Sequence, residues 1–424
     1  MKYLSICLML ILILLTGCGN RQGEEENRLS SIQIVDRNGF KETISAPERL
    51  RYYEHTDFFA PQPYEKVMRV YTRNTQGKTP SKMTTYHSNG ELWQYLEVVN
   101  GRARGYYREW HENGVLRLEL TVIEGLGDLS EEAQLSWIFD GPSRAWDSEG
   151  HLLAEIYYEK GKLQGNALYY HPNGKVSKII PYENDRIEGD LIYYDEKGSV
   201  LGKTPYRRGL KQGIATFKGD RNIPPYSEEY DQDLLMEATY QDFSGKILAT
   251  IENGKGKQAL FQEGKLQSIQ EYQKGIPQGE VQRFDARGRL HNLFHIKEGM
   301  KHGEEWVYYT AFDDLTPQPK LYIQWSEDVA QGMMRTWYEN GALESERELY
   351  DNQKHGVSSC WYRDGSLMMV EEYENDQLYR GTYMKKGDPT PVSTVDQGEG
   401  TATLYDPDGF FIKRVSYKKG IPVD

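Results

Sequence analysis

Chemistry at a protein site requires histidine, cysteine or carboxylate side chains at suitable spacings, and this chain of 424 residues contains nine histidines and three cysteines. Five of the histidines occupy recurring positions and form no motif. His87, His111 and His171 directly follow an aromatic residue, and His302 and His355 precede a glycine. Repeated positions of this kind are typical of polar groups at turns and strand ends, so we expect no metal site.

Motifs for catalysis are lacking as well. The sequence has no H-E-x-x-H, no G-x-S-x-G and no phosphate-cradling loop. Adjacent glutamates such as Glu304-Glu305 and Glu371-Glu372 would point to opposite faces of a strand, so they cannot act together as acid and base. Carboxylates paired across neighbouring strands stay an open alternative. We expect a protein that is not an enzyme and holds no cofactor.

Cys18 is the cysteine with a recognisable chemical role. It ends the tetrapeptide Leu15-Thr16-Gly17-Cys18, which directly follows an apolar run from Leu4 to Leu15. The run is too short to span a bilayer and is typical of a signal peptide. The tetrapeptide resembles the lipobox of bacterial lipoproteins. The alternative is a short N-terminal anchor in which this cysteine has no role.

The lipobox resemblance implies that residues 1–17 are a signal peptide and that a lipid on Cys18 anchors the chain to a membrane. For a Gram-negative source, which the sequence does not establish, Gly19 after the cysteine implies an outer-membrane location, without indicating which side the chain faces. Cys7 would leave with the signal peptide, so Cys360 would be alone and no internal disulfide is expected. We expect Cys360 to be a packed side chain on a strand and not a nucleophile.

Composition and charge exclude further classes of function. The formal net charge is −13, whereas a nucleic-acid-binding surface needs a basic stripe, so no nucleic-acid partner is expected. Acidic charge also disfavours a broad face lying on anionic lipid. Hydrophobic residues make up 38% and the mean hydropathy is −0.75, yet there are 32 tyrosines and 41 glycines. Such a composition suits thin sheets covered by large amphipathic rings and joined by tight turns.

A nine-residue step between two glycines recurs along the chain, as between Gly105 and Gly114 or between Gly165 and Gly174. The first glycine of each pair, which we call the anchor glycine, returns about every 24 residues, and such a period indicates a repeat architecture. The anchor glycines that carry this interpretation are Gly105, Gly141, Gly165, Gly189, Gly213, Gly279, Gly303, Gly332 and Gly356.

Each repeat is expected to be one β-hairpin. The second glycine often follows asparagine or aspartate, as in Asn113-Gly114, and we call this the Asn-Gly turn. Asn-Gly between apolar-patterned runs predicts a type I′ turn, whose two central residues both have positive φ. A second turn, such as Lys160-Gly161, comes four residues before the next anchor glycine. Two turns per repeat leave strands of about 5–7 residues.

An aromatic residue lies five positions after each anchor. Since successive side chains of a strand alternate between faces, one fixed offset places these rings on one face of the sheet. Stacked hairpins would bring them into a ladder, which we interpret as a structural spine, with a ligand-binding strip as the alternative. The ladder comprises Tyr86, Trp110, Trp146, Tyr170, Tyr194, Phe261, Phe284, Tyr308, Trp337, Trp361 and Tyr405.

The stretch Y-Y-H-P-N-G-K at residues 169–175 and the second-turn segment Lys160-Gly161-Lys162-Leu163-Gln164-Gly165 resemble the bacterial variant of the MORN (membrane occupation and recognition nexus) repeat. This resemblance implies an all-β fold in which hairpins stack into one elongated antiparallel sheet or solenoid. It covers roughly fourteen units over about residues 68–424, with degenerate anchors at Ser81, Met236 and Gly256. Bacterial proteins with this repeat are often labelled antitoxins, so an antitoxin-like role is implied too.

The remaining segments complete the expected organisation. Residues 18–31 are expected to be a polar tether, and residues 32–67 a divergent N-terminal β segment with one hairpin around Asp36-Arg37-Asn38-Gly39. The repeat array of residues 68–424 is interrupted near 115–140, 219–235 and 310–319. Ser130 predicts the N-cap of a short helix in the first insertion, and the other two insertions are expected to be loops.

Three functional hypotheses follow. The first is a repeat-based protein-interaction scaffold in the cell envelope, with a protein partner whose identity the sequence does not indicate. The second is an immunity or antitoxin-like protein that neutralises a toxin. The third is binding of glycan or peptidoglycan through aromatic residues on the solvent face, such as Tyr107, Tyr169 and Tyr193. Insertions in a solenoid often make the contacts, so the inserted segments are expected to take part.

Overall fold

The computed structural model describes residues 28–310 and 317–423. Residues 1–17 and Cys18, to which the signal peptide and the lipid were assigned, lie outside the described residues, as do most of the tether and part of the third insertion. The chain divides into an N-terminal unit, Met1–Asp185, and a C-terminal unit, Arg186–Asp424. In both units the described residues lie mainly in β-strands, so the prediction of an all-β fold is confirmed.

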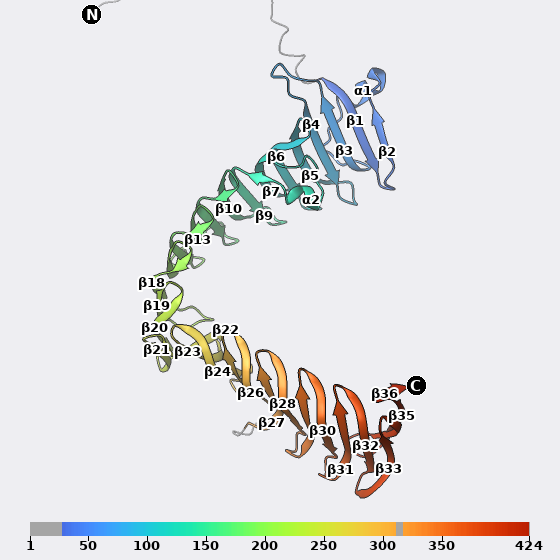
Figure 1. The fold of residues 1–424 in the computed structure, drawn as a ribbon. Coiled ribbons are helices and arrows are strands. Elements are labelled where there is room, and N and C mark those ends of the chain that lie inside the picture. Colours follow the sequence, from blue (N-terminus) through green and yellow to red (C-terminus); the bar gives the residue numbers. More distant parts are fainter. Residues whose placement is uncertain (1–27, 311–316, 424) are drawn as a thin grey trace, which may run out of the picture. The chain divides into compact units, whose positions relative to one another are not determined.

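The N-terminal unit contains thirteen strands and two short helices in its described part (Figure 1). In chain order these are β1 (Leu29–Asp36), β2 (Lys41–Ile44), α1 (Pro47–Tyr53), β3 (Tyr64–Tyr71), β4 (Pro80–Tyr86), β5 (Leu92–Val99), β6 (Arg102–Trp110), β7 (Leu116–Glu124), α2 (Glu131–Gln134), β8 (Ile138–Phe139), β9 (Gly141–Trp146), β10 (Leu152–Glu159), β11 (Lys162–Leu163), β12 (Gly165–Tyr170) and β13 (Val176–Glu183).

The described part of the C-terminal unit contains strands alone. In chain order these are β14 (Arg186–Ile187), β15 (Gly189–Tyr194), β16 (Val200–Arg207), β17 (Leu210–Lys211), β18 (Gly213–Phe217), β19 (Tyr226–Asp231), β20 (Leu234–Gln241), β21 (Ile247–Glu252), β22 (Lys255–Gln262), β23 (Lys265–Gln273), β24 (Ile276–Phe284), β25 (Leu290–Lys297), β26 (Met300–Tyr308), β27 (Pro319–Ser326), β28 (Val329–Trp337), β29 (Leu343–Tyr350), β30 (Gln353–Trp361), β31 (Leu367–Glu374), β32 (Gln377–Lys385), β33 (Asp388–Asp396), β34 (Glu399–Tyr405), β35 (Phe411–Lys418) and β36 (Ile421–Val423).

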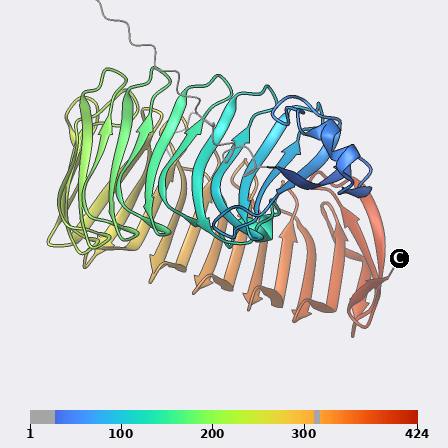
Figure 2. The ribbon, with the colours of Figure 1, turned by 90° about the horizontal axis from the view of Figure 1, so that it is seen from above.

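Most strands pair antiparallel with the strand that follows them in the chain, which confirms the expected architecture of stacked hairpins. Within the N-terminal unit the order is β2-β1-β3-β4-β5-β6-β7, and β9, β10, β12 and β13 continue the meander. Within the C-terminal unit the meander runs from β15 to β36. Figure 2 shows the strands of each unit lying side by side as successive rungs.

The two turns of a repeat have different conformations, and the prediction of type I′ for the Asn-Gly turn is wrong. Asn113 does not have positive φ, and Gly114 alone is left-handed at 79°. The N–H of His111 donates to the carbonyl of Val115 and the N–H of Gly114 to that of His111, so the loop is a type I turn closed by a left-handed glycine. Five residues separate the paired Trp110 and Leu116, and a two-residue turn cannot fill that span.

Type I′ geometry lies at the opposite edge, in the second turn. Lys160 and Gly161 have φ of 49° and 86°, and Asn184 and Asp185 have 50° and 67°. Several strands also run through the anchor glycine and are longer than predicted, as β6 begins three residues before Gly105. Strands β9, β12, β15 and β18 begin at their anchor glycine. All nine predicted anchor glycines have positive φ, between 73° and 124°, and a register shift accompanies several of them.

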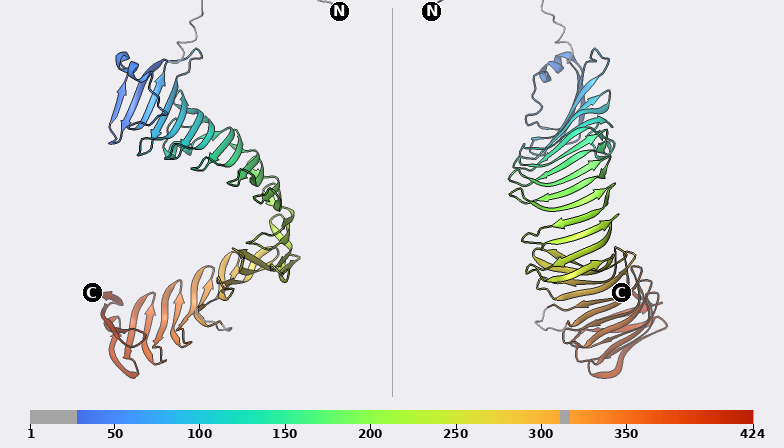
Figure 3. Two further views of the ribbon diagram at one scale, coloured as in Figure 1. Left: turned by 180° about the vertical axis from the view of Figure 1, so that it is seen from behind. Right: turned by 90° about the vertical axis from the view of Figure 1, so that its left-hand side faces the viewer.

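Two hydrophobic clusters stabilise the N-terminal unit. In the first, Leu50 of α1 packs with β1 to β4, and Phe58 from the segment after α1 joins it. Figure 3 shows the helix α1, in blue, beside the first strands of this unit. In the second, Trp137 and Leu129 of the first insertion pack with strands β4 to β7. Ser130 caps α2 by accepting from the N–H of Ala133 at 3.4 Å, so the predicted N-cap is confirmed.

The C-terminal unit has two further clusters. One lies over β18 to β23 and includes Tyr230, Tyr240 and Ile251, and the other lies over β31 to β35 and includes Tyr373 and Tyr383. Both are built largely from tyrosine and alanine, as expected for a chain with few aliphatic residues. None of the helices in the described residues is long and apolar enough to span a bilayer.

Several predicted segment boundaries differ from the structure. Leu29–Ser31, assigned to the tether, belong to β1, because Leu29 and Ile32 are buried. Residues 32–67 form the predicted hairpin, β1 and β2, but also α1, whose sequence signal is Pro47 at the first helical turn. The insertion at 115–140 includes strand β7, and the predicted loop 219–235 includes β19 and its second turn Gln232-Asp233.

Candidate interaction surface

The ladder aromatics lie at one edge of the hairpins, beside the Asn-Gly turns. Ten of the eleven are the last residue of their strand, and Phe261 is the last but one. Tyr86 is buried and the others are partly buried. Their ring contacts reach aromatic residues outside the ladder: Trp110 contacts Phe59, Trp337 stacks on Trp306, Tyr405 contacts Phe411 and Phe261 contacts Phe243.

At several repeats the residue after the ladder aromatic joins its hairpin to the next one. His87 Nε2 lies 2.9 Å from the carbonyl oxygen of Trp110, and His111 Nε2 lies 3.1 Å from that of Trp146. At three repeats of the C-terminal unit a tyrosine takes this position, and the hydroxyl of Tyr362, for example, donates to the carbonyl of Met384 at 2.8 Å. These histidines therefore link turns, and the described residues contain no His, Cys, Asp and Glu group that could hold a metal ion.

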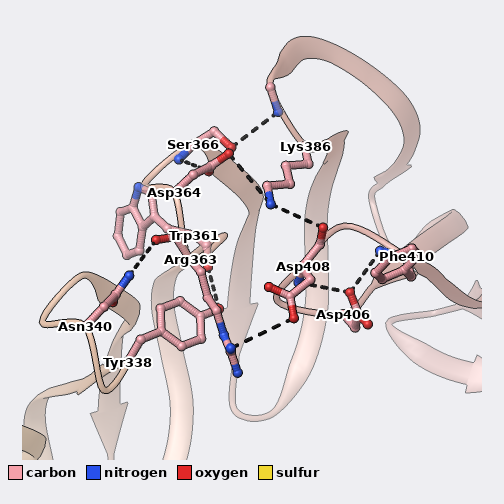
Figure 4. A network of polar contacts seen from close by, with 11 residues as sticks. Tyr338, Asn340, Trp361, Arg363, Asp364, Ser366, Lys386, Asp406, Asp408 and Phe410 are labelled. Carbon is pink, nitrogen blue, oxygen red and sulfur yellow. Dashed lines mark hydrogen bonds and ion pairs between the residues drawn. The ribbon is translucent and has the colours of Figure 1, made fainter.

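The asparagine of the Asn-Gly turn adds a second link. Its side-chain oxygen accepts from its own turn, whereas its Nδ2 donates to a carbonyl of the next turn, at 2.8 Å from Asn89 to Glu112 and 3.0 Å from Asn340 to Arg363. Figure 4 shows this edge near Arg363, whose guanidinium lies 3.9 Å from Asp408 and over the ring of Tyr338. Side chains thus join the turns at residues 338–342, 362–366 and 406–410 at this edge.

Replacing Tyr362 by Phe is expected to lower the free energy of unfolding of the C-terminal unit by about 1–2 kcal/mol, because the buried carbonyl of Met384 loses its donor. Tyr379→Phe is the matched control: its ring is exposed, and we expect a change within about 0.5 kcal/mol. Amide hydrogen exchange of β30 and β32 would measure both. Equal effects of the two changes would contradict the proposed link.

The opposite edge is joined through the second turn. The second residue of the turn accepts a backbone N–H from the preceding repeat, as in Leu163 to Asp185 at 2.7 Å, Lys211 to Asp233 at 2.6 Å and Lys354 to Asp376 at 2.8 Å. Its own N–H donates back to the same repeat. Both edges of the hairpin stack are therefore closed by repeated hydrogen bonds.

Two buried glutamates lie at equivalent positions of the C-terminal unit. Glu228 accepts hydrogen bonds from Tyr230, two residues on, at 2.8 Å, and from Tyr240, twelve residues on, at 2.6 Å. Glu371 accepts from Tyr373 and Tyr383 at the same offsets, at 3.0 and 2.8 Å. The corresponding signal in the sequence is E-E-Y followed ten residues later by a second Y, a pattern that the period of glycines and aromatics does not reveal.

The adjacent glutamates confirm the prediction of opposite faces: Glu371 and Glu305 are buried, whereas Glu372 and Glu304 are exposed. A cross-strand carboxylate pair, the alternative left open, does occur, because Glu229 of β19 lies directly opposite Glu237 of β20. These two line a cavity of about 240 Å³. Glu237 accepts the backbone N–H of Asn253 at 2.8 Å, so it serves a turn.

Cys360 is partly buried and unpaired. Burial raises the pKa of its thiol to about 11, so the thiol stays protonated near neutral pH. A protonated thiol is a poor nucleophile. The local environment of Cys360 thus agrees with a packing role.

Comparisons with known proteins identify the repeat. Residues 163–184, which span the anchor Gly165, the Asn-Gly turn and β13, match the family described as the MORN repeat variant. The chain contains a MORN-type repeat. No significant match was found among curated proteins.

Solved structures that match in part belong to toxin complexes. The crystal structure of TcdB2-TccC3-TEV has 12% identity and a TM-score of 0.15, with 90% of this chain and 24% of that chain covered. The Photorhabdus luminescens Tc holotoxin pore has 12% identity and a TM-score of 0.14, with 92% and 26% covered. The chain thus spans about a quarter of these proteins, and TM-scores this low support no conclusion about function.

The faces of the MORN-type hairpins do not present the predicted strip of tyrosines. Tyr107 is only 2% exposed, because Trp137 of the first insertion packs on its ring, with 4.8 Å between the two ring centroids. Tyr169 is partly buried under the ammonium group of Lys178, 4.1 Å from the ring centroid, and Tyr193 is 42% exposed. The expectation that all three lie on the solvent face is wrong for Tyr107, because the inserted segment covers it.

Alkaline pH is expected to destabilise the C-terminal unit. Burial raises the pKa of Tyr226 and Tyr272 to about 12, from about 10 in an unfolded chain. Between these values the unfolded chain has released protons that the folded unit retains, so stability falls as pH rises, by up to about 1.4 kcal/mol per pH unit for each such tyrosine. Urea unfolding at pH 8 and pH 11, with phenolate absorbance at 295 nm, would measure this. Titration of every tyrosine near pH 10 in the folded protein would contradict it.

Proposed function

We propose that the chain is a non-enzymatic scaffold that binds a protein partner through its hairpin stack and inserted segments. One observation carries the proposal. Histidines and asparagines at several repeat positions are hydrogen-bonded to backbone carbonyls of neighbouring turns, at 2.9 Å for His87 and 2.8 Å for Asn89. Residues that could do chemistry are thus used to hold hairpins together, and stacked repeats of this kind are the form that binding solenoids share.

The inserted segments supply surfaces that the repeat alone lacks. The first insertion covers β5 to β7 through Trp137 and leaves Leu135 on its outside, 89% exposed. The loop between β18 and β19 folds back on the turn of β22 and β23, where the N–H of Gly264 donates to the carbonyl of Asn222 at 2.9 Å. Contacts made by such insertions would give one array a specific partner.

We extend the proposal to the cell envelope, because the lipobox-like tetrapeptide at Cys18 would anchor the array to a membrane by lipid. The partner then belongs to the same compartment. The second hypothesis, neutralisation of a toxin, would use the same binding surface, with a toxin as the protein partner. Binding of glycan is less favoured, since Tyr107 is covered.

Affinity purification of the full-length chain from crosslinked membranes, read by mass spectrometry, tests the proposal. The expected result is one protein partner recovered in near-stoichiometric amount, with crosslinks to the described insertions. Cys18→Ala is the control, because it removes the lipid site without changing the array. Recovery of bulk envelope protein alone, equal for both forms, would overturn the scaffold proposal.

A further inference from the structure

A small cavity lies in the C-terminal unit where the loop between β18 and β19 covers the sheet. Its volume is about 120 Å³, which corresponds to about four water molecules at roughly 30 Å³ each. Strands β19, β20 and β22 form its floor and the loop forms its rim. The lining includes Pro224, Pro225, Tyr226, Glu228, Tyr240 and Phe261.

Glu228 is the charged group of this cavity. It is 8% exposed and accepts hydrogen bonds from Tyr230, Tyr240 and the Nε2 of Gln258, the last at 3.1 Å. No lysine, arginine or histidine of the described residues forms an ion pair with it. Lys211 instead donates to the hydroxyl of Tyr230, at 3.3 Å.

A buried carboxylate without a cation is costly. Glu371 shares this state with Glu228 but lies outside the cavity, whereas two other carboxylates of the chain have a cation nearby. Glu305 is equally buried, and its carboxylate accepts from the Nζ of Lys301 at 2.6 Å. Glu109 lies 3.7 Å from Arg117. Glu228 differs from both because its uncompensated charge faces a cavity.

Aromatic rings form the other walls of the cavity. The rings of Tyr226 and Tyr240 lie 6.2 Å apart, and Phe217 stacks on Tyr226 at 5.5 Å. Phe261 of β22 also lines the cavity. Ring faces carry negative potential and attract cations, so the rings and the carboxylate favour the same class of ligand.

We propose that this cavity binds an alkylammonium group, namely the side chain of a lysine presented by the protein partner. The inference rests on the scaffold function proposed above. A carboxylate has about four acceptor positions, and three are already used by Tyr230, Tyr240 and Gln258. One position remains, which suits the single point charge of an ammonium better than the two-pronged donor of a guanidinium.

The test uses Nα-acetyl-lysine amide as the probe, with the full-length chain, and calorimetric or NMR titration as the readout. The neutral isostere Nα-acetyl-norleucine amide is the control ligand. We expect the lysine probe to bind at least tenfold more tightly than the norleucine probe. Equal binding of both probes, or no binding of the lysine probe, would overturn the inference.

The chain offers a matched control variant. Glu371 has the same tyrosine pair as Glu228 but does not line this cavity. We therefore expect Glu228→Gln to weaken the lysine probe at least tenfold and Glu371→Gln to leave it unchanged. Equal weakening by both changes would overturn the assignment to this site.

A second variant keeps the inference testable if Glu228→Gln fails to fold. Phe261→Leu removes one aromatic wall and keeps the carboxylate, so we expect several-fold weaker binding of the lysine probe; unchanged binding would overturn the aromatic contribution. Probe binding and partner recovery from membranes are independent measurements. A partner recovered in the absence of probe binding would overturn this inference and leave the scaffold proposal standing.

Discussion

Replacing Trp137 by Ala is expected to lower the stability of the N-terminal unit by about 3–5 kcal/mol, the range for removing a large buried aromatic side chain. Trp137 is 8% exposed, packs edge-on to Tyr107 and donates from Nε1 to the carbonyl of Leu126 at 2.8 Å. The change would remove a ring from the cluster that joins the first insertion to β5, β6 and β7. It would also leave a carbonyl without its donor.

Leu135→Ala is the matched control for this prediction. Leu135 lies two residues away in the same insertion, but it is 89% exposed, so we expect a change within about 0.5 kcal/mol. Urea unfolding of the full chain, followed by amide hydrogen exchange of β6 and β7, would compare the two. The exchange measurement is needed because long repeat arrays do not unfold in two states. Similar protection in the wild type and in Trp137→Ala would show that the insertion does not stabilise the sheet.

The contrast between Trp137 and Leu135 illustrates what the sequence could predict. The period of glycines and aromatics predicts stacked hairpins because turns and alternating faces are local properties. Whether an inserted segment covers a face depends on contacts between residues distant in the chain. Tyr107 has the pattern of a solvent-face residue in its own strand, yet Trp137 buries it.

The turns show the same limit on a smaller scale. Asn-Gly is the strongest local signal for a type I′ turn. Around Asn113-Gly114, however, the hydrogen bonds close a longer loop of residues 111–115. The side chain of Asn113 donates to the carbonyl of Ser148 in the next turn. The I′ conformation instead occurs at pairs such as Asn184-Asp185, where no glycine is present. Neighbouring repeats thus select the turn conformation that local propensity alone leaves open.

The candidate site was the least predictable part. Glu228 and Glu371 are charged residues at strand positions where the alternation of faces predicts apolar ones. Each is bonded to one tyrosine of its own strand and one of the next strand. The E-E-Y and following Tyr pattern was visible at both places. The pattern predicts a buried carboxylate only once it is known that residues twelve apart, such as Glu228 and Tyr240, meet across one hairpin.

Gly256→Ala is expected to destabilise the C-terminal unit by about 3–5 kcal/mol, because strain and overlap act together. Gly256 has φ of 147°, and an added Cβ would overlap the backbone carbonyl oxygen of Thr250 and lie 2.8 Å from the Cα of Ile251. Backbone atoms of a paired strand cannot move aside without breaking the ladder between β21 and β22.

Gly245→Ala is the control for this prediction. Gly245 has φ of 87°, and an added Cβ would have no atom within 4 Å, so we expect only the cost of the left-handed conformation, about 1–2 kcal/mol. Hydrogen exchange of β21 and β22 would measure both changes. Equal losses of stability from the two changes would contradict this prediction. They would mean that the left-handed backbone conformation alone requires glycine at position 256, and that the close approach of Thr250 and Ile251 adds nothing.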